Sequence, residues 1–289
     1  MKRLLFLLLA LTLLWSAASA EAACPQRVVS LYGSFAEAWL QAGGSLVGVT
    51  EDAVSERQLA LADGVAIIGT NKAPNLELIL ALDPDWVILS ADIAAQLEAQ
   101  ELLTQAGIPA TAYQVDTYQD YLKMMDDFTR LTGRRDLYEK LVPPMVQSIE
   151  ETIAKASQMP SPRVLLIRAY SSGAKAKAAD NLAGVILQDL HTDNIAARQK
   201  SLLEELTLEA IVAEDPQFIF ITIMGQDAQA ALDALNASLG QNPAWQALTA
   251  VQNSQVHLLP KELFHYKPNA RWGESYAYLF NLLYGSQEP

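Results

Sequence analysis

Cysteine and histidine are scarce in this chain, and each shortage excludes a kind of site. Cys24 is the only cysteine, so no disulfide bond can form within the chain. The three histidines are His191, His257 and His265, and only His265 falls in a loop that is a candidate for lining a cleft. A site for a bare metal ion needs three or four nitrogen, oxygen or sulfur ligands, so one histidine argues against such a site.

Basic residues and catalytic motifs are also lacking. The chain has 20 lysines and arginines against 33 aspartates and glutamates, which gives a net charge of −13. This balance argues against binding to nucleic acid, which requires a basic face. The sequence contains no G-x-S-x-G elbow, no P-loop and no H-E-x-x-H pair. We therefore expect a binding protein and not an enzyme, with no metal or cofactor of its own.

The first twenty residues have the pattern of a signal peptide. Lys2 and Arg3 precede an apolar run that is short for a membrane span, and Ala18-Ser19-Ala20 fits a cleavage site. We therefore expect an exported, periplasmic protein. Cys24 follows closely and raises the alternative of a membrane-anchored lipoprotein. However, Glu21 stands where a lipobox has an aliphatic residue, so a free thiol is favoured.

One stretch occurs twice and organises the rest of the chain. Residues 75–90 read NLELILALDPDWVILS, and residues 207–222 read TLEAIVAEDPQFIFIT. Each copy predicts a short helix with an N-cap (Asn75 or Thr207), an Asp-Pro break and a buried strand. An apolar run of this length is typical of a parallel strand that is covered on both faces. The repeat therefore predicts two α/β halves of similar plan.

The chain between the two copies predicts a helical bridge. No strand pattern occurs in residues 118–160, and residues 134–157 keep helical spacing, with a kink expected at Pro143 and Pro144. The expected fold class is α/β, with two Rossmann-like lobes of mostly parallel sheets bridged by one long helix. Its parts are a signal peptide at 1–20, an N-terminal lobe at 21–117, a helical linker at 118–160 and a C-terminal lobe at 161–289.

Ligands of open parallel sheets bind beyond the carboxyl ends of the strands, so two such lobes predict a cleft between them. The candidate ligand-binding residues at these ends and in nearby loops are Tyr32, Ser34, Lys72, Ser90, Arg168, Tyr170, Lys175, Lys177, Met224, Phe264, His265 and Tyr266. The C-terminal set is basic and aromatic in an acidic protein, which favours an anionic ligand. Arg168 is the leading anchor, because a guanidinium pairs with carboxylates, phosphates and catecholates. For single lysines such as Lys175 and Lys177, a solvated surface charge is the simpler interpretation.

Glu77 and Glu209 occupy the same position in the two repeat copies, in the first helical turn. A carboxylate there stabilises the helix dipole, which is a sufficient structural reason for it. Matched charges on two lobes also suit a two-point docking surface for a pseudosymmetric partner.

These features together resemble the class III periplasmic substrate-binding proteins of ABC importers, the helical-backbone metal-receptor type that serves cobalamin, ferric siderophores and haem. The resemblance is carried by RVVSLYGSFAEAWLQAG from Arg27, both repeat copies, the long helix, TDNIA at 192–196 and PNARWGESYAYLFNLLYG from Pro268. It covers essentially the whole mature chain, although Gln217 stands where the family usually has aspartate. It implies two lobes bridged by one long helix, little lobe closure, and one glutamate per lobe that pairs with arginines of a permease dimer. By position these glutamates are Glu77 and Glu209.

The resemblance and the basic cleft predict a monomeric carrier that delivers a small iron chelate, a ferric siderophore or haem, to an ABC permease dimer. Cobalamin or another corrinoid is the alternative cargo within the class. An alternative of another class is an enzyme or metallocluster assembly factor on a two-lobed chelatase- or nitrogenase-like fold. Such proteins need cysteines for clusters, and this chain has one.

Overall fold

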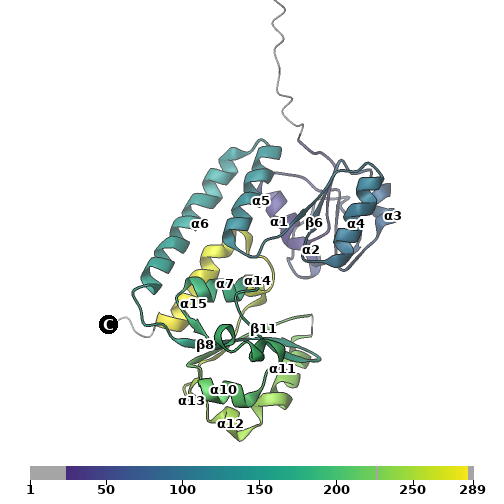
Figure 1. Cartoon of the computed structure of the whole chain (residues 1–289). Helices are drawn as coiled ribbons and strands as arrows, with labels where there is room; N and C mark the ends of the chain where they lie inside the picture. The colour runs from purple at the N-terminus through teal and green to yellow at the C-terminus, as the bar shows by residue number, and fades with distance from the viewer. Residues whose placement is uncertain (1–23, 226, 286–289) are drawn as a thin grey trace, which may run out of the picture.

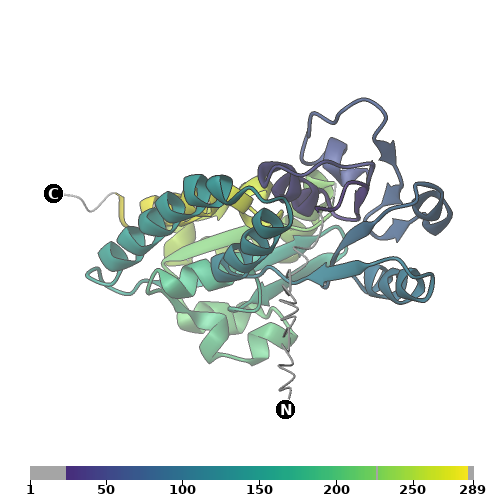
Figure 2. The same ribbon diagram turned by 90° about the horizontal axis from the view of Figure 1, so that it is seen from above.

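Two α/β lobes lie beside a pair of long helices in the structure, a computed structural model that describes residues 24–225 and 227–285 (Figure 1). The pair is α5 (Tyr118–Leu131) and α6 (Arg135–Ala156). The predicted signal peptide lies outside the described residues. Seen from above, the purple and blue N-terminal lobe is at one end of the molecule, and α15 (Trp272–Tyr284) extends toward the other (Figure 2). The predicted fold class is confirmed.

The N-terminal lobe is built on a sheet of parallel strands in the order β3-β2-β1-β6-β7. Its strands are β1 (Val28–Ser30), β2 (Gly48–Val49), β3 (Ala66–Ile67), β6 (Trp86–Ser90) and β7 (Ala110–Tyr113). Its helices are α1 (Gly33–Gln41), α2 (Asp52–Ser55), α3 (Leu76–Ala81) and α4 (Ala94–Gln105). A small hairpin, β4 (Gly69–Thr70) and β5 (Ala73–Pro74), stands apart from the sheet. Every residue of β6 is buried, as the apolar run of the first repeat copy predicts.

The C-terminal lobe has a second sheet in the order β10-β8-β11-β12. Its strands are β8 (Arg163–Tyr170), β9 (Gly173–Lys177), β10 (Asp193–Asn194), β11 (Phe218–Ile223) and β12 (Val256–Leu258). Its helical segments are α7 (Leu182–Asp189), α8 (Ile195–Arg198), α9 (Ser201–Glu204), α10 (Leu208–Glu214), α11 (Ala228–Leu235), η1 (Asn236–Gly240), α12 (Pro243–Gln246), α13 (Thr249–Gln252), α14 (Lys261–Phe264) and η2 (Asn269–Arg271). Because β6 and β11 belong to different sheets, the two repeat copies lie in separate lobes, as predicted.

Strand β9 corrects the sequence interpretation, which placed Lys175 and Lys177 in a loop. The strand pairs antiparallel with β8, and Arg168 lies opposite Lys175. Ala176 is buried while Lys175 is exposed, so the Ala-Lys-Ala-Lys alternation is that of a strand with one covered face. A run this short, made of residues with low strand propensity, gives only a weak signal in the sequence.

Helix α6 continues without interruption through Pro143 and Pro144, so the predicted kink does not break it. A proline removes the hydrogen bond to the carbonyl four residues earlier. The carbonyls freed in this way belong to Glu139 and Lys140, which are both exposed, so water can satisfy them. No helix within residues 24–225 and 227–285 is both long and apolar enough to cross a membrane.

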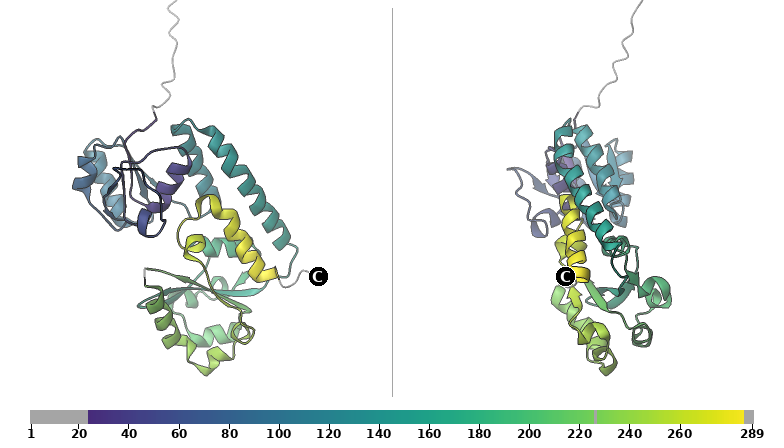
Figure 3. Two further views of the ribbon diagram at one scale, coloured as in Figure 1. Left: turned by 180° about the vertical axis from the view of Figure 1, so that it is seen from behind. Right: turned by 90° about the vertical axis from the view of Figure 1, so that its left-hand side faces the viewer.

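The C-terminal end of the chain returns from the second lobe to the first. Helix α15 lies alongside α6, as both views of Figure 3 show. Just before it, the Asn269 side chain donates to the Ser34 carbonyl and to Glu37, both at 2.7 Å, and so fastens the end of the chain to α1. Glu37 also forms an ion pair with Arg57. Three parts of the chain therefore connect the lobes. They are the helix pair α5 and α6, helix α15, and the segment that precedes α15.

A central hydrophobic cluster joins the inner face of each sheet to the helical bridge. It includes Val28 of β1, Leu166 of β8 and Trp272 of α15, all fully buried. The outer face of each sheet has its own cluster. Ile79 of α3 packs on the first sheet's outer face, and Ile211 of α10 packs on the second sheet's outer face. Helices α3 and α10, the helices of the two repeat copies, therefore hold equivalent outer positions.

The Asp-Pro break is built in the same way in both copies. Asp83 and Asp215 both have left-handed φ angles, 45° and 41°. Gln217 accepts the backbone N–H of Arg163 at 2.9 Å, as Asp85 accepts that of Arg27 at 3.0 Å. Gln217, which stands where the family usually has aspartate, therefore makes the same kind of hydrogen bond as Asp85 does in the first copy.

The N-caps of the two repeat helices differ. The Asn75 side chain accepts the backbone N–H of Leu78, as predicted for an N-cap. Thr207 also holds the predicted N-cap position, but its side chain accepts no capping hydrogen bond.

Candidate functional site

The inner face of the second sheet changes character along β8. Side chains on a strand alternate between the two faces, so Leu166, Arg168 and Tyr170 share one face. Leu166 is buried in the central cluster, whereas Arg168 and Tyr170 are partly exposed. Thr222 of β11 lies opposite Arg168 in the ladder. Near the start of β8 this face packs against the bridge helices. At the carboxyl end of the strand the same face carries an arginine and a tyrosine.

His265, the residue that follows α14, lies within the field of positive charges from both lobes. Burial, followed by the nearby charges of Arg168, Lys261, Lys267 and Lys72, lowers the pKa of His265 to about 4. Lys72 belongs to the β4–β5 hairpin of the first lobe, whereas Arg168 belongs to the second lobe. Both lobes therefore contribute positive charge to the surroundings of this histidine. We call Lys72, Arg168, Lys261 and Lys267 the cation cluster.

The members of the cation cluster differ in how well they are already paired. Lys267 is 8% exposed and pairs with Asp92 at 3.0 Å and Asp116 at 3.3 Å. Lys261 donates to the carbonyl of Gly225. Arg168 and Lys72 have no ion pair and no side-chain hydrogen bond to any other residue of 24–225 and 227–285. These two cations are the ones left for an incoming anion.

Acidic and phenolic groups line the side of the site that belongs to the first lobe. Asp52 is 7% exposed, and its Oδ2 accepts the backbone N–H of Gly33 at 2.7 Å. Its Oδ1 is buried without a hydrogen-bond partner in the described part of the chain. Burial, and next to it the charge of Asp52, raises the pKa of both Tyr32 and Glu56. Burial, followed by the charge of Glu56, raises the pKa of Tyr266 to about 12.

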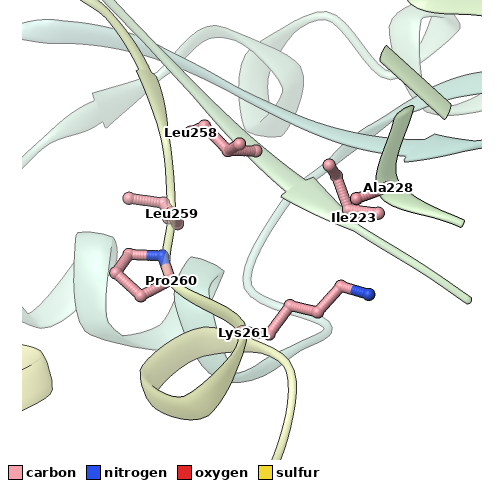
Figure 4. Close-up of a pocket in the computed structure, with 6 residues that line it drawn as sticks. All are labelled: Ile223, Ala228, Leu258, Leu259, Pro260 and Lys261. Atoms are coloured by element: carbon pink, nitrogen blue, oxygen red, sulfur yellow. The ribbon is translucent and has the colours of Figure 1, made fainter. Parts of the chain in front are cut away.

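A small apolar pocket adjoins the cation cluster at the carboxyl ends of β11 and β12. Its volume is about 240 Å³, and it is lined by Ile223, Ala228, Leu258, Leu259, Pro260 and Lys261. Figure 4 shows the Lys261 side chain extending from the start of α14 toward Ile223 and Ala228. The site thus offers an apolar surface beside its positive charge.

The structure brings only some of the predicted ligand residues to the site. Lys72, Arg168, His265 and, through Glu56, Tyr266 share one electrostatic environment. Tyr170 and Met224 are partly exposed where β8 and β11 end.

Other predicted ligand residues are buried or already paired. Ser34 and Ser90 are each 1% exposed, and Phe264 is 3% exposed. The Ser90 hydroxyl accepts a hydrogen bond from the backbone N–H of Asp92, so it is used within the loop that follows β6. Lys177 forms an ion pair with Asp180.

Four residues of the site were not among the predicted ligand residues, namely Asp52, Glu56, Lys261 and Lys267. Asp52 and Glu56 follow β2, so the rule that ligands bind at carboxyl ends of strands also points to them. No group of three or more His, Cys, Asp or Glu side chains suited to a metal ion occurs within residues 24–225 and 227–285.

Two lobes, a helical bridge and positive charge contributed by both lobes fit a substrate-binding protein. The chain belongs to the periplasmic binding protein family, whose sequence model matches residues 28–263. This confirms the family that the sequence predicts and agrees with export.

Individual relatives fit this assignment. The chain is 27% identical to the Fe(3+) dicitrate-binding periplasmic protein FecB of Escherichia coli (strain K12), over 80% of this chain and 76% of that protein. It is 24% identical to the Fe(3+)-citrate-binding protein YfmC of Bacillus subtilis (strain 168), over 81% of this chain and 72% of that protein. The solved structure of an ABC transporter substrate-binding protein from Listeria monocytogenes EGD-e matches with a TM-score of 0.74 and 18% identity, over 90% of this chain and 99% of that one.

Proposed function

We propose that this protein captures an anionic iron chelate of the ferric citrate type and delivers it to an ABC importer. The observation that carries the proposal is the cation cluster, in which both lobes contribute charge and Lys72 and Arg168 have no partner in the described part of the chain. Two relatives are ferric citrate-binding proteins by name. A ferric hydroxycarboxylate is a compact anion, which suits convergent positive charge.

The chemistry of recognition follows from the side chains present. Arginine and lysine donate charge-assisted hydrogen bonds to carboxylates. We therefore propose that the iron arrives with its own ligands, and that Arg168 and Lys72 hold the carboxylates of the chelate from opposite lobes. The neighbouring acidic groups, Asp52 and Glu56, suit the hydroxyl groups of such a ligand, since carboxylates accept hydrogen bonds from hydroxyls.

Haem is the second candidate, because one observation favours it. A pKa near 4 keeps the His265 imidazole neutral at neutral pH, which is the form that ligates iron. The haem propionates would use the same cations. Cobalamin, the alternative within the class, carries amides and one phosphodiester but no carboxylate for Lys72 and Arg168 to bind.

Delivery is proposed to use the two repeat glutamates. Glu77 and Glu209 are exposed, and each is the acidic residue in the first turn of its helix, α3 or α10. We propose that they pair with cations on the two subunits of a permease dimer, while the carrier itself acts as a monomer without enzymatic activity. Cys24 is partly exposed, and we propose that it stays a free thiol.

Native mass spectrometry of the protein purified from its own host tests the proposed cargo. A retained ferric citrate complex, seen as a mass increment that disappears on acidification, is the expected result. A retained corrinoid would overturn the choice of cargo, and retained haem would favour the second candidate.

A further inference from the structure

Helices α3 and α10 carry an unusual share of exposed apolar side chains. They have six and seven residues, yet they hold three of the nine large apolar side chains that are exposed in residues 24–225 and 227–285. These three are Leu78, Leu80 and Val212, with 46%, 47% and 42% of their surface exposed. None of the three belongs to a hydrophobic cluster of the fold. The fold alone therefore gives no reason for them.

Two of these side chains occupy equivalent positions in the repeat. Leu80 follows Glu77 by three residues, and Val212 follows Glu209 by three residues. Residues three apart are neighbours on a helix surface, so each helix presents an acidic group beside an aliphatic one. The one buried residue of each helix is also equivalent, Ile79 in α3 and Ile211 in α10. Both helices are therefore rotated in the same way about their axes, with the same pair turned outward.

We propose that Leu80 and Val212 are apolar anchors of the surface that docks on the importer, each buried beside its glutamate in a matching recess on one permease subunit. This inference rests on the proposed delivery through Glu77 and Glu209. A single exposed leucine is normal on a protein surface. A glutamate–aliphatic pair repeated on two lobes, and outside every hydrophobic cluster, fits a partner with twofold symmetry.

The apolar contact adds what the charges cannot supply alone. An exposed ion pair contributes little to affinity and weakens as salt rises, whereas the burial of an aliphatic side chain is not screened by salt. The partner that fits offers, on each of two subunits, a cation with an apolar recess next to it.

The two halves of this surface are not equal. Leu78 is exposed beside Leu80, whereas its counterpart Ala210 packs against the outer cluster of its own lobe. The first lobe therefore offers the larger apolar area, and Leu80 is the stronger of the two anchors.

The test uses the host's importer, reconstituted in lipid vesicles, and the carrier loaded with ferric citrate. The quantity measured is the carrier concentration that gives half-maximal stimulation of the importer's ATPase. For Leu80→Ser with Val212→Ser, this concentration should rise about tenfold or more, which is the range of an interface hot spot. Leu80→Ser alone should have the larger effect of the two single variants. Cargo affinity and melting temperature should stay those of the unaltered protein.

The matched control removes exposed leucines elsewhere on the two lobes, with Leu102→Ser in α4 and Leu203→Ser in α9. It should stimulate within about twofold of the unaltered protein, since neither residue lies on the proposed surface. An unchanged value for the Leu80 and Val212 variant, or an equal rise in the control, overturns the inference. If Glu77→Lys with Glu209→Lys abolishes stimulation while Leu80→Ser with Val212→Ser does not, delivery through the glutamates stands and the apolar anchors are wrong.

Discussion

At the scale of single residues, the proposed ligand recognition depends on cations that the fold leaves without partners. Two members of the cation cluster are already engaged, Lys267 with Asp92 and Asp116 and Lys261 with the carbonyl of Gly225. Arg168 stands at the end of an otherwise apolar strand face and pairs with nothing in the described part of the chain. A partly exposed arginine without a protein partner is free to form charge-assisted hydrogen bonds with an anionic ligand.

Arg168→Ala should therefore weaken binding of ferric citrate by about 1.5–3 kcal/mol, the range of a hydrogen bond to a charged group. The measurement is the dissociation constant from quenching of tryptophan fluorescence. Arg198→Ala is the matched control, because Arg198 lies in the same lobe but is paired with Asp193 and Glu214. Equal dissociation constants for Arg168→Ala and the unaltered protein would remove Arg168 from the site.

His265 gives a second prediction, about pH. Its pKa is about 4 in the folded protein, mainly because of burial, and about 6.5 in an unfolded chain. Between these values the unfolded chain binds a proton that the native protein does not. Stability that is fully present above pH 6.5 is therefore lost as the pH falls toward 4, by at most about 3 kcal/mol. Glu56, whose pKa is raised by burial and Asp52, works in the opposite direction.

The check compares urea unfolding at pH 7.5 and pH 5 for the unaltered protein and His265→Gln. The variant should lose less stability on acidification, because it lacks the group that titrates. His191→Asn is the control, since asparagine tolerates the left-handed φ of 61° at that exposed position. If all three proteins show the same pH dependence, His265 does not have the lowered pKa.

At the scale of elements, the segment between α14 and α15 acts as a latch between the lobes. Lys267 reaches two carboxylates of the first lobe that follow β6 and β7. Lys267→Met keeps the length of the side chain but leaves those carboxylates without their cation. Because both aspartates keep about a third of their surface in water, we expect a loss of about 1–2 kcal/mol in the free energy of unfolding, less than for a fully buried pair. Lys123→Met, which removes an exposed pair with Asp120, should cost less than about 0.5 kcal/mol.

Much of the element order could be predicted, because it depends on local patterns. Apolar runs located β6 and β11, and helical spacing located α6. The latch could not be predicted from a local pattern, because Lys267 is 175 residues from Asp92 and 151 residues from Asp116 in the sequence. The rule that ligands bind beyond the carboxyl ends of parallel strands indicated where the site lies, but not which side chains face it. Ser90, for example, turns its hydroxyl back to its own loop.

At the scale of the whole molecule, the carrier must bind its cargo and its importer with different surfaces. The cation cluster lies between the lobes, whereas Glu77 and Glu209 stand on helices that cover the outer sheet faces. That both glutamates face the mouth of the cleft stays a prediction. Separate surfaces imply that docking can be removed without loss of cargo binding.

Glu77→Lys with Glu209→Lys should keep cargo affinity and shift the melting temperature by only a few degrees, because a first-turn glutamate contributes only about 0.3–1 kcal/mol to its helix. Transport should be lost, since like charges at an interface cost several kcal/mol. The control reverses one other exposed glutamate on each lobe, Glu98→Lys and Glu204→Lys, and should transport normally. Normal uptake by the first variant would leave both glutamates with only a helix-end role.

The central claim, capture of an anionic ferric chelate, is tested most directly by titrating the purified, cargo-free protein with ferric citrate, haem and cobalamin by isothermal calorimetry at two salt concentrations. The account predicts saturable binding of ferric citrate that weakens as salt rises, because charge on the cation cluster supplies part of the affinity. Cobalamin should bind weakly or not at all. Tight, salt-independent binding of cobalamin with no heat from ferric citrate would contradict the account.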